Sequence, residues 1–293
     1  MKIKRKPQDA VFDFCNVAFM TVMMVVTLYP MLHVLFASVS DANALQQHRG
    51  LLFAPTGFSL AAYGKVFENP MIPVGYANTL IYLFFGTLIN VVLTTLGAYA
   101  LSRPSLMLGK YIMFGIVFTM LFSGGMIPTY LLIRDLHMIN SRLALMIPNA
   151  ISAWNLVIMR TAFRGVPPSM EESAKIDGAN DFTILLRIFV PLSLPVLSVI
   201  VLFYGVSHWN SWFNAMLYIR QRTLYPIQLV LREILLISTA DMTTSVNTGD
   251  DKANIGETIK YATVAVATLP ILFVYPFLQK YFVKGIMVGA IKE

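Results

Sequence analysis

Six long stretches of this chain contain no Asp, Glu, Lys or Arg. A helix needs about 20 predominantly apolar residues to cross the hydrocarbon core of a bilayer, with a range of roughly 17–25. Each stretch reaches this length, and we therefore expect an all-α polytopic membrane protein with six transmembrane helices. The stretches run over residues 14–40, 69–102, 111–133, 143–159, 188–219 and 261–279.

The composition also favours a membrane protein. Only 13% of the 293 residues are charged, whereas soluble domains carry about 25%. Lys2, Lys4, Arg5 and Lys6 precede the first stretch, as in a signal peptide, but its apolar run exceeds the roughly 7–15 residues of a signal-peptide core. We expect an uncleaved first span.

The charge-free stretches define one predicted transmembrane domain, residues 1–293. The second and fifth stretches exceed one crossing but are too short for two, so each holds a single span. An even number of crossings puts both termini on the same side of the membrane. We place the spans at about residues 14–40, 76–101, 111–133, 143–160, 191–216 and 260–281.

The basic residues predict the orientation. Thirteen of the 22 Lys and Arg residues lie in the terminal segments and in the loops 101–110 and 160–187, which together are shorter than the loops on the other side. The positive-inside rule then makes these segments, including both termini, cytoplasmic. The net charge of +7 is thus a topology signal, and we expect no nucleic-acid partner.

The predicted cytoplasmic loop 164–190, between the fourth and fifth spans, begins with helix-boundary signals. Pro167 and Pro168 end any helix that arrives from the fourth span. Ser169 stands three residues before Glu172, which is the spacing of a capping box. A new short helix is therefore expected to begin here.

The same loop then carries signals for a turn and a second helix. Glu171 and Lys175 are spaced as ion-pair partners on a helix, and Gly178 can end that helix in the left-handed conformation. Asn180 or Asp181 can cap a second helix that leads into the fifth span. Small residues around the turn would let another surface approach closely. A docking knob and a well-capped solvated loop are both compatible with these features.

The letters of this loop are EESAKIDGA, followed by RIFVPLSLP. They resemble the EAA motif of the membrane subunits of ABC importers, roughly Glu-Ala-Ala-x-x-Asp-Gly-Ala and then Ile-x-x-Pro-Leu-x-x-Pro. Ser173 departs from the motif, because alanine is usual there. The matching residues are Glu172, Ala174, Asp177, Gly178, Ala179, Ile188, Pro191, Leu192 and Pro195.

In that family the motif forms the coupling helices that dock into a groove of the ATP-binding subunit. We call residues 164–190 the EAA element. The resemblance implies a type I ABC importer fold in which this element is a cytoplasmic helix-turn-helix. It also implies which residues couple the chain to the ATPase: Glu171, Glu172, Ala174, Asp177, Gly178, Ala179 and Pro191.

The resemblance covers nearly the whole chain. The chain is similar to the carbohydrate-uptake, maltose-type family and, within it, to the LplC/YtcP subgroup of sugar permeases. It implies a pore-forming subunit of an ATP-driven importer for saccharides, with oligosaccharides such as uronate-containing alginate or pectin fragments as the substrate class. Expected partners are a second homologous permease in a heterodimer, two ATP-binding subunits, an extracytoplasmic solute-binding protein and membrane lipid. The expected location is the bacterial cytoplasmic (inner) membrane.

Polar and aromatic residues inside the predicted spans are candidates for a substrate path. Aromatic faces pack against the apolar faces of sugar rings, and amides hydrogen-bond to their hydroxyls. For the Trp209–Asn214 group we favour an interfacial aromatic belt. The candidate path residues are Asn149, Ser152, Trp154, Asn155 and Asn210.

The predicted external loop, residues 220–259, is long enough to have a role of its own. We expect it to serve as a platform for the solute-binding protein, although a flexible solvated loop would have a similar composition.

Two other classes of function compete with this interpretation. An ion-coupled secondary transporter usually needs ionisable groups within the membrane, and the six apolar stretches hold no acid, Lys or Arg. A membrane enzyme would need a nucleophile, base or metal cluster, but His33 and His208 have no neighbouring carboxylate or cysteine in the sequence. The chain has no phosphate-binding Gly-x-x-x-x-Gly-Lys-[Ser/Thr] loop, so we expect a non-enzyme without a cofactor or metal, with ATP-Mg bound by its partners.

Overall fold

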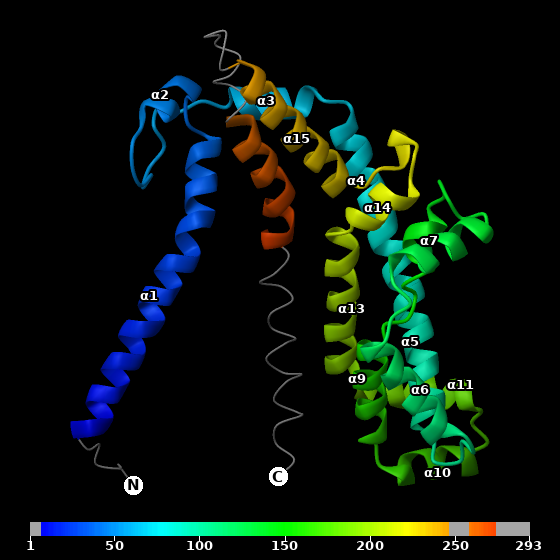
Figure 1. Ribbon diagram of the computed structural model, residues 1–293. Helices are drawn as coiled ribbons and strands as arrows, with labels where there is room; N and C mark the ends of the chain where they lie inside the picture. Colours follow the sequence, from blue (N-terminus) through cyan, green and yellow to red (C-terminus); the bar gives the residue numbers. More distant parts are fainter. Residues whose placement is uncertain (1–6, 246–257, 274–293) are drawn as a thin grey trace. The chain divides into compact units, whose positions relative to one another are not determined.

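The computed structural model describes residues 7–245 and 258–273 (Figure 1). These residues are nearly all helical, and their one isolated β-bridge joins Ser40 and Phe58. They fall into two compact units: of the described residues, unit 1 holds 7–69, 231–245 and 258–269, and unit 2 holds 70–230 and 270–273. The helical fold class agrees with the sequence, whereas the six spans and the single domain stay predictions.

Unit 1 contains a long apolar helix at the position of the first predicted span. Val11–Ser38 is long and apolar enough to cross a membrane, and its residues 11–28 are all exposed. The predicted external loop, 220–259, contains the 19-residue helix α15. Residues 246–257 of this loop and residues 274–281 of the last predicted span lie outside the described residues. The helices are α1 (Pro7–Ser38), α2 (Ala42–Gln47), α3 (Ala61–Glu68) and most of both α15 (Ile227–Ser245) and Thr258–Phe273.

Unit 2 is built along one helix of 32 residues, Met71–Ser102, which also meets the length and hydropathy of a membrane span. It consists of α4 (Met71–Ile81), a π-helical segment η1 (Tyr82–Gly86) and α5 (Thr87–Ser102). A π-helical turn within an α-helix shifts the register of the following side chains and is frequent at functional sites.

Three other predicted spans are broken. The third consists of α6 and α7, bent by 115° around residues 122–125. The fifth is bent by 87° at Ser193, as expected from Pro191 and Pro195 on either side, since proline cannot continue the helical hydrogen-bond ladder. The fourth is short and interrupted between residues 147 and 152. The elements are α6 (Gly109–Leu121), α7 (Met126–Asp135), α8 (Leu143–Met146), α9 (Ala153–Arg164), α10 (Pro168–Ile176), α11 (Asp181–Ile184), η2 (Leu185–Phe189), α12 (Val190–Leu192), α13 (Leu194–Trp209), α14 (Phe213–Tyr218) and η3 (Arg222–Leu224).

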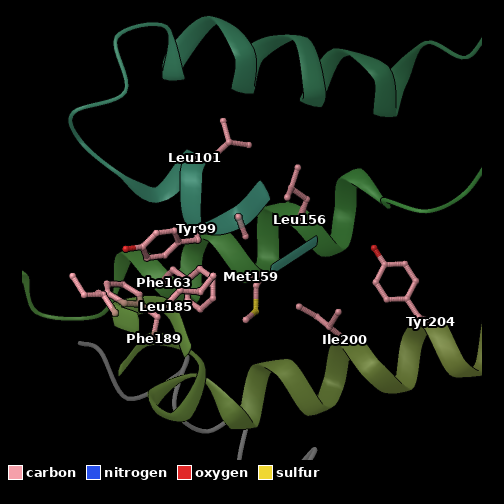
Figure 2. Packing of buried hydrophobic residues seen from close by; sticks show 11 residues of the cluster. Tyr99, Leu101, Leu156, Met159, Phe163, Leu185, Phe189, Ile200 and Tyr204 are labelled. Atoms are coloured by element: carbon pink, nitrogen blue, oxygen red, sulfur yellow. The ribbon is translucent and has the colours of Figure 1, made fainter. Parts of the chain in front are cut away.

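Helices α5, α9 and α13 pack against one another in unit 2 (Figure 1). Figure 2 shows the buried side chains between them, with three aromatic rings grouped at one end and Tyr204 at the other. The rings of Tyr99, Phe163 and Phe189 meet edge to face at centroid distances of 5.3–6.3 Å, the arrangement that aromatic pairs favour. This cluster supports α10 at one end of the bundle.

Candidate functional site

A cavity of about 720 Å³ lies among α5, α9, α13, α14 and the segment that precedes α9. All five substrate-path residues predicted from the sequence line it. The structure therefore brings together residues from two predicted spans that are far apart in the chain. The lining is Asn90, Leu145, Asn149, Ile151, Ser152, Trp154, Asn155, Phe203, Tyr204, Ser207, His208, Asn210, Ser211, Trp212, Phe213 and Asn214.

The lining combines amides, hydroxyls and aromatic rings, and it contains no Asp, Glu, Lys or Arg. Trp154 is 59% exposed and offers a ring face for stacking, whereas Asn155 is buried. Such a surface can pack against the apolar face of a sugar ring and hydrogen-bond to its hydroxyl rim. The cavity carries no fixed charge from these side chains, and it can hold a polar, ring-shaped solute.

Asn90 on α5 holds one wall of the cavity. It is 1% exposed, and its Nδ2 donates to the carbonyls of Asn149 and Ala150 at 2.8 and 2.9 Å. Carbonyls only accept, so these bonds fix the amide orientation and turn Oδ1 toward His208 Nε2, 2.7 Å away. His208 Nε2 must therefore carry a hydrogen and donate it to Asn90.

A second hydrogen-bond group fixes the same wall one helical turn further on. The Tyr204 hydroxyl of α13 accepts from the backbone N–H of Ser152 at 2.9 Å and lies 2.7 Å from Thr94 Oγ1 on α5. Ser152 in turn caps α9, because its Oγ accepts from the Asn155 N–H. The path residues at the start of α9 are thus held by side chains of both neighbouring helices.

Gly86, the last residue of the π-helical segment, allows His208 to approach α5. A Cβ at this position would lie 2.5 Å from two atoms of the His208 ring. Only glycine leaves room for a ring at this distance. The sequence did not indicate a role for His208, because its partner Asn90 lies 118 positions away.

The expected interfacial belt at Trp209–Asn214 is wrong for Trp209, which is only 7% exposed. Its ring packs against Tyr76 at a centroid distance of 6.4 Å, so its apolar surface is covered by protein. Asn210, Trp212 and Asn214 line the cavity instead. These three residues lie at and just after the helix break that follows α13.

The EAA element has the predicted helix-turn-helix form. Gly178 adopts a left-handed φ of 79°, and Asn180 Oδ1 accepts from the Thr183 N–H at 2.8 Å to cap the second helix. The predicted capping box at Ser169 is wrong: α10 begins at Pro168, and its N-cap, Pro167, makes no side-chain bond. Proline fits the first turn because that position has no helical partner for an N–H.

The seven predicted coupling residues differ in exposure. Glu172, Asp177, Gly178 and Pro191 are exposed, whereas Ala174 and Ala179 pack against the unit 2 core. Glu171 points inward and pairs with Arg103. The EAA element thus has an outer surface, formed at the turn, and an inner surface that holds it on the bundle.

The predicted absence of a metal stays a prediction. Over residues 7–245 and 258–273 no group of three or more His, Cys, Asp or Glu residues could hold a metal ion.

Known proteins similar to this chain are transport permeases. No protein-family model matches it. The polygalacturonan/rhamnogalacturonan transport system permease protein YtcP of Bacillus subtilis (strain 168) is 40% identical over 288 residues, which cover 97% of this chain and 99% of that protein. Protein LplC of the same organism is 38% identical, over 96% of this chain and 95% of that protein.

A solved structure agrees with these relatives. The chain superimposes with a TM-score of 0.86 on a chain from the crystal structure of a bacterial ABC transporter involved in the import of the acidic polysaccharide alginate. The two chains are 32% identical, and the match covers 96% of this chain and all of the other. The fold of an ABC importer permease is thereby established.

These similarities confirm the predicted resemblance to the LplC/YtcP subgroup and the predicted function as a sugar importer subunit. They replace the alternative of an ion-coupled secondary transporter. The chain belongs to the family of sugar ABC transporter permeases, non-catalytic membrane subunits of importers in which separate subunits hydrolyse ATP.

Proposed function

We propose that this chain forms part of the translocation path of an importer for uronate-containing oligosaccharides. The observation that carries the proposal is the neutral cavity of unit 2, in which amides and aromatic rings converge. Two similar proteins support the substrate class, because polygalacturonan and alginate are both polymers of uronic acids. Their shared chemistry is a chain of sugar rings with carboxylates.

The lining of the cavity suits such a substrate. Trp154 and Trp212 supply faces for the rings, and the amides of Asn149, Asn155 and Asn210 supply donors for hydroxyls and carboxylates. No acidic side chain lines the cavity to repel a uronate. A site made of neutral donors also avoids the cost of burying an unpaired charge in a membrane protein, and it can release its ligand.

The EAA element is the proposed coupling device. We assign its exposed turn, with Glu172, Asp177 and Gly178, to a groove of an ATP-binding subunit. Closure of the two ATP-binding subunits would then move this element as a rigid body and switch the access of the cavity from one side of the membrane to the other. The chain itself needs no cofactor, since ATP-Mg is bound by these partners.

The proposed assembly contains a second, homologous permease in a heterodimer, two ATP-binding subunits and an extracytoplasmic solute-binding protein. The segment 220–259, which includes α15, is the proposed contact for the solute-binding protein. The chain spans the bacterial cytoplasmic membrane in contact with lipid, with six crossings and both termini cytoplasmic. It has no nucleic-acid partner.

The test is uptake by the complete importer in proteoliposomes. With ATP inside and solute-binding protein outside, we expect uptake of oligogalacturonate or oligoalginate and no comparable uptake of a neutral maltooligosaccharide of equal length. Vesicles without ATP are the control. Preferential uptake of the neutral sugar would contradict the uronate assignment, and uptake without ATP would contradict the importer mechanism.

A further inference from the structure

Arg103, the residue after the last turn of α5, packs against two aromatic rings. Its guanidinium carbon lies 4.3 Å from the centroid of Tyr99 and 4.2 Å from that of Phe189. Its side chain is only 14% exposed, and Nη2 donates to Ser102 Oγ at 3.3 Å. The two ring centroids are 5.3 Å apart and the ring planes meet at 79°, so the guanidinium lies in the corner that the rings form, and cation–π contact with both rings restricts its position.

Glu171 on α10 completes this arrangement. Its Oε2 accepts from Arg103 Nη1, and its Oε1 lies 2.8 Å from Lys175 Nζ. The side chain is 16% exposed. Both carboxylate oxygens are thus engaged within the chain, and Glu171 is not available to a partner as the exposed Glu172 is.

Two other ion pairs of the described residues give a contrast. In Lys65–Glu68 the side chains are 57% and 65% exposed, and in Arg134–Asp135 they are 57% and 64% exposed. Such surface pairs contribute little to stability or geometry. The Arg103–Glu171 pair differs in being mostly buried, in contact with two aromatic rings and formed between residues 68 positions apart.

The pair joins the coupling surface to the helix that lines the cavity. Asn90, which holds the cavity wall, lies on α5 about 20 Å from Arg103 at the helical rise of about 1.5 Å per residue. A displacement of α10 can therefore reach the cavity through one rigid helix. The chain connection to α9, which packs on α5, is a second link between α10 and α5, and the Arg103–Glu171 pair adds a direct side-chain link.

We propose that Arg103 and Glu171 form a clamp that transmits the movement of α10 to α5, so that Glu171 acts as a positioning residue and does not contact the ATP-binding subunit. The inference rests on the proposed function in one respect, namely that α10 meets that subunit. It assigns Glu171 a different role from the exposed coupling residues of the same motif.

The test measures oligosaccharide imported per ATP hydrolysed by the complete importer in proteoliposomes. We expect Glu171→Gln and Arg103→Gln each to lower this ratio roughly fivefold or more, while substrate-loaded binding protein still stimulates ATP hydrolysis. The double variant should be no worse than either single one, because the two residues act as a unit. Arg103→Lys keeps the charge but loses the planar guanidinium that contacts both rings, and its ratio should lie between those of the unaltered importer and Arg103→Gln.

Matched controls are Glu68→Gln and Arg134→Gln, which remove the same groups from exposed pairs and should leave the ratio unchanged. An unchanged ratio in both Glu171→Gln and Arg103→Gln would overturn the clamp. So would additive losses in the double variant, or a parallel loss of import and ATP hydrolysis that follows the amount of assembled complex.

Asp177→Lys, measured in parallel, separates this inference from the proposed function. Normal import per ATP in Asp177→Lys would contradict docking of the EAA turn. Loss of coupling in Asp177→Lys with a normal ratio in Glu171→Gln would contradict the clamp alone.

Discussion

The cavity and the EAA element are both polar regions of unit 2 attached to α5, yet they are built from opposite kinds of polar groups. The cavity uses neutral side chains, with Asn90 making three hydrogen bonds. The EAA element uses charges: its Glu171 forms ion pairs with Lys175 of the same element and with Arg103 at the end of α5. The difference follows what each region must do.

A binding cavity must admit a polar solute and release it again. Neutral hydrogen bonds give orientation with modest net energy, and they avoid a buried unpaired charge. A mechanical connection needs one fixed geometry, and a mostly buried arginine–carboxylate pair provides it. The variants below test whether the two regions are separable in this way, from the largest expected effect to the smallest.

Gly178→Trp should have the largest effect, and only on coupling. A non-glycine residue at a φ of 79° is strained, and an indole would block the exposed turn that we assign to the ATP-binding subunit. We expect import to fall at least about tenfold, equivalent to roughly 1.4 kcal/mol, with the chain still inserted. Import assays and immunoblots of membrane fractions measure both.

Gly64→Trp is the matched control, because Gly64 is exposed on α3 and a Cβ there meets no atom within 4 Å. It should import normally. Normal import by Gly178→Trp would remove the docking turn from the mechanism.

Asn90→Leu should mainly reduce stability. It leaves the carbonyls of Asn149 and Ala150 and the Nε2–H of His208 without their partner. His208 is buried, and a buried unsatisfied group costs about 1–3 kcal/mol. We expect the Tm of the detergent-solubilised importer to fall by several degrees. An unchanged Tm would show that the hydrogen bonds around Asn90 do not hold the cavity wall.

Gly86→Ala should be destabilising through a steric clash. The new Cβ would lie 2.5 Å from the His208 ring, and overpacking of this kind costs about 1–3 kcal/mol. Thermal unfolding measures the loss. In a His208→Ala background the clashing ring is absent, so Gly86→Ala should lower stability less than it does in the unaltered chain. An equal loss with and without the His208 ring would place the cause elsewhere.

Trp154→Ala should have the smallest effect, confined to the substrate. The ring lines the cavity but is 59% exposed, so its removal should leave Tm unchanged. Loss of one stacking face should raise the half-saturation concentration for uronate oligosaccharide roughly threefold to tenfold, or about 1 kcal/mol. Trp154→Phe should recover most of the affinity, and unaltered kinetics in Trp154→Ala would exclude this ring from the path.

Local features were predictable from the sequence, whereas most of the contacts that hold the sites were not. Gly178 and Asn180 act over a few residues, and their roles as turn and cap follow from backbone preferences. The Arg103–Glu171 and Asn90–His208 contacts join residues 68 and 118 positions apart, and no local pattern encodes such pairs.

Charge-free stretches likewise predicted apolar helices but not their breaks. Pro191 and Pro195 predict the bend at Ser193. The 115° bend between α6 and α7 lies at residues 122–125 (FSGG), where Gly125 has a φ of 85°, and it was not predicted. The sequence placed Trp209 at the membrane interface from its residue type alone. Its burial could not be predicted, because it depends on packing against Tyr76, which is distant in the sequence.

The central claim, that the EAA turn meets an ATP-hydrolysing subunit, is tested most directly by crosslinking in the assembled importer. Cys15 is the one cysteine of the chain, so a Cys15→Ser background allows a photo-crosslinker to be attached at Ser173→Cys, an exposed position on α10, or at the exposed Arg134→Cys as control. The account predicts an adduct with the ATP-binding subunit from position 173 and none from position 134. Labelling of position 173 only from the outer side of the membrane, or crosslinking that never reaches the ATP-binding subunit, would contradict it.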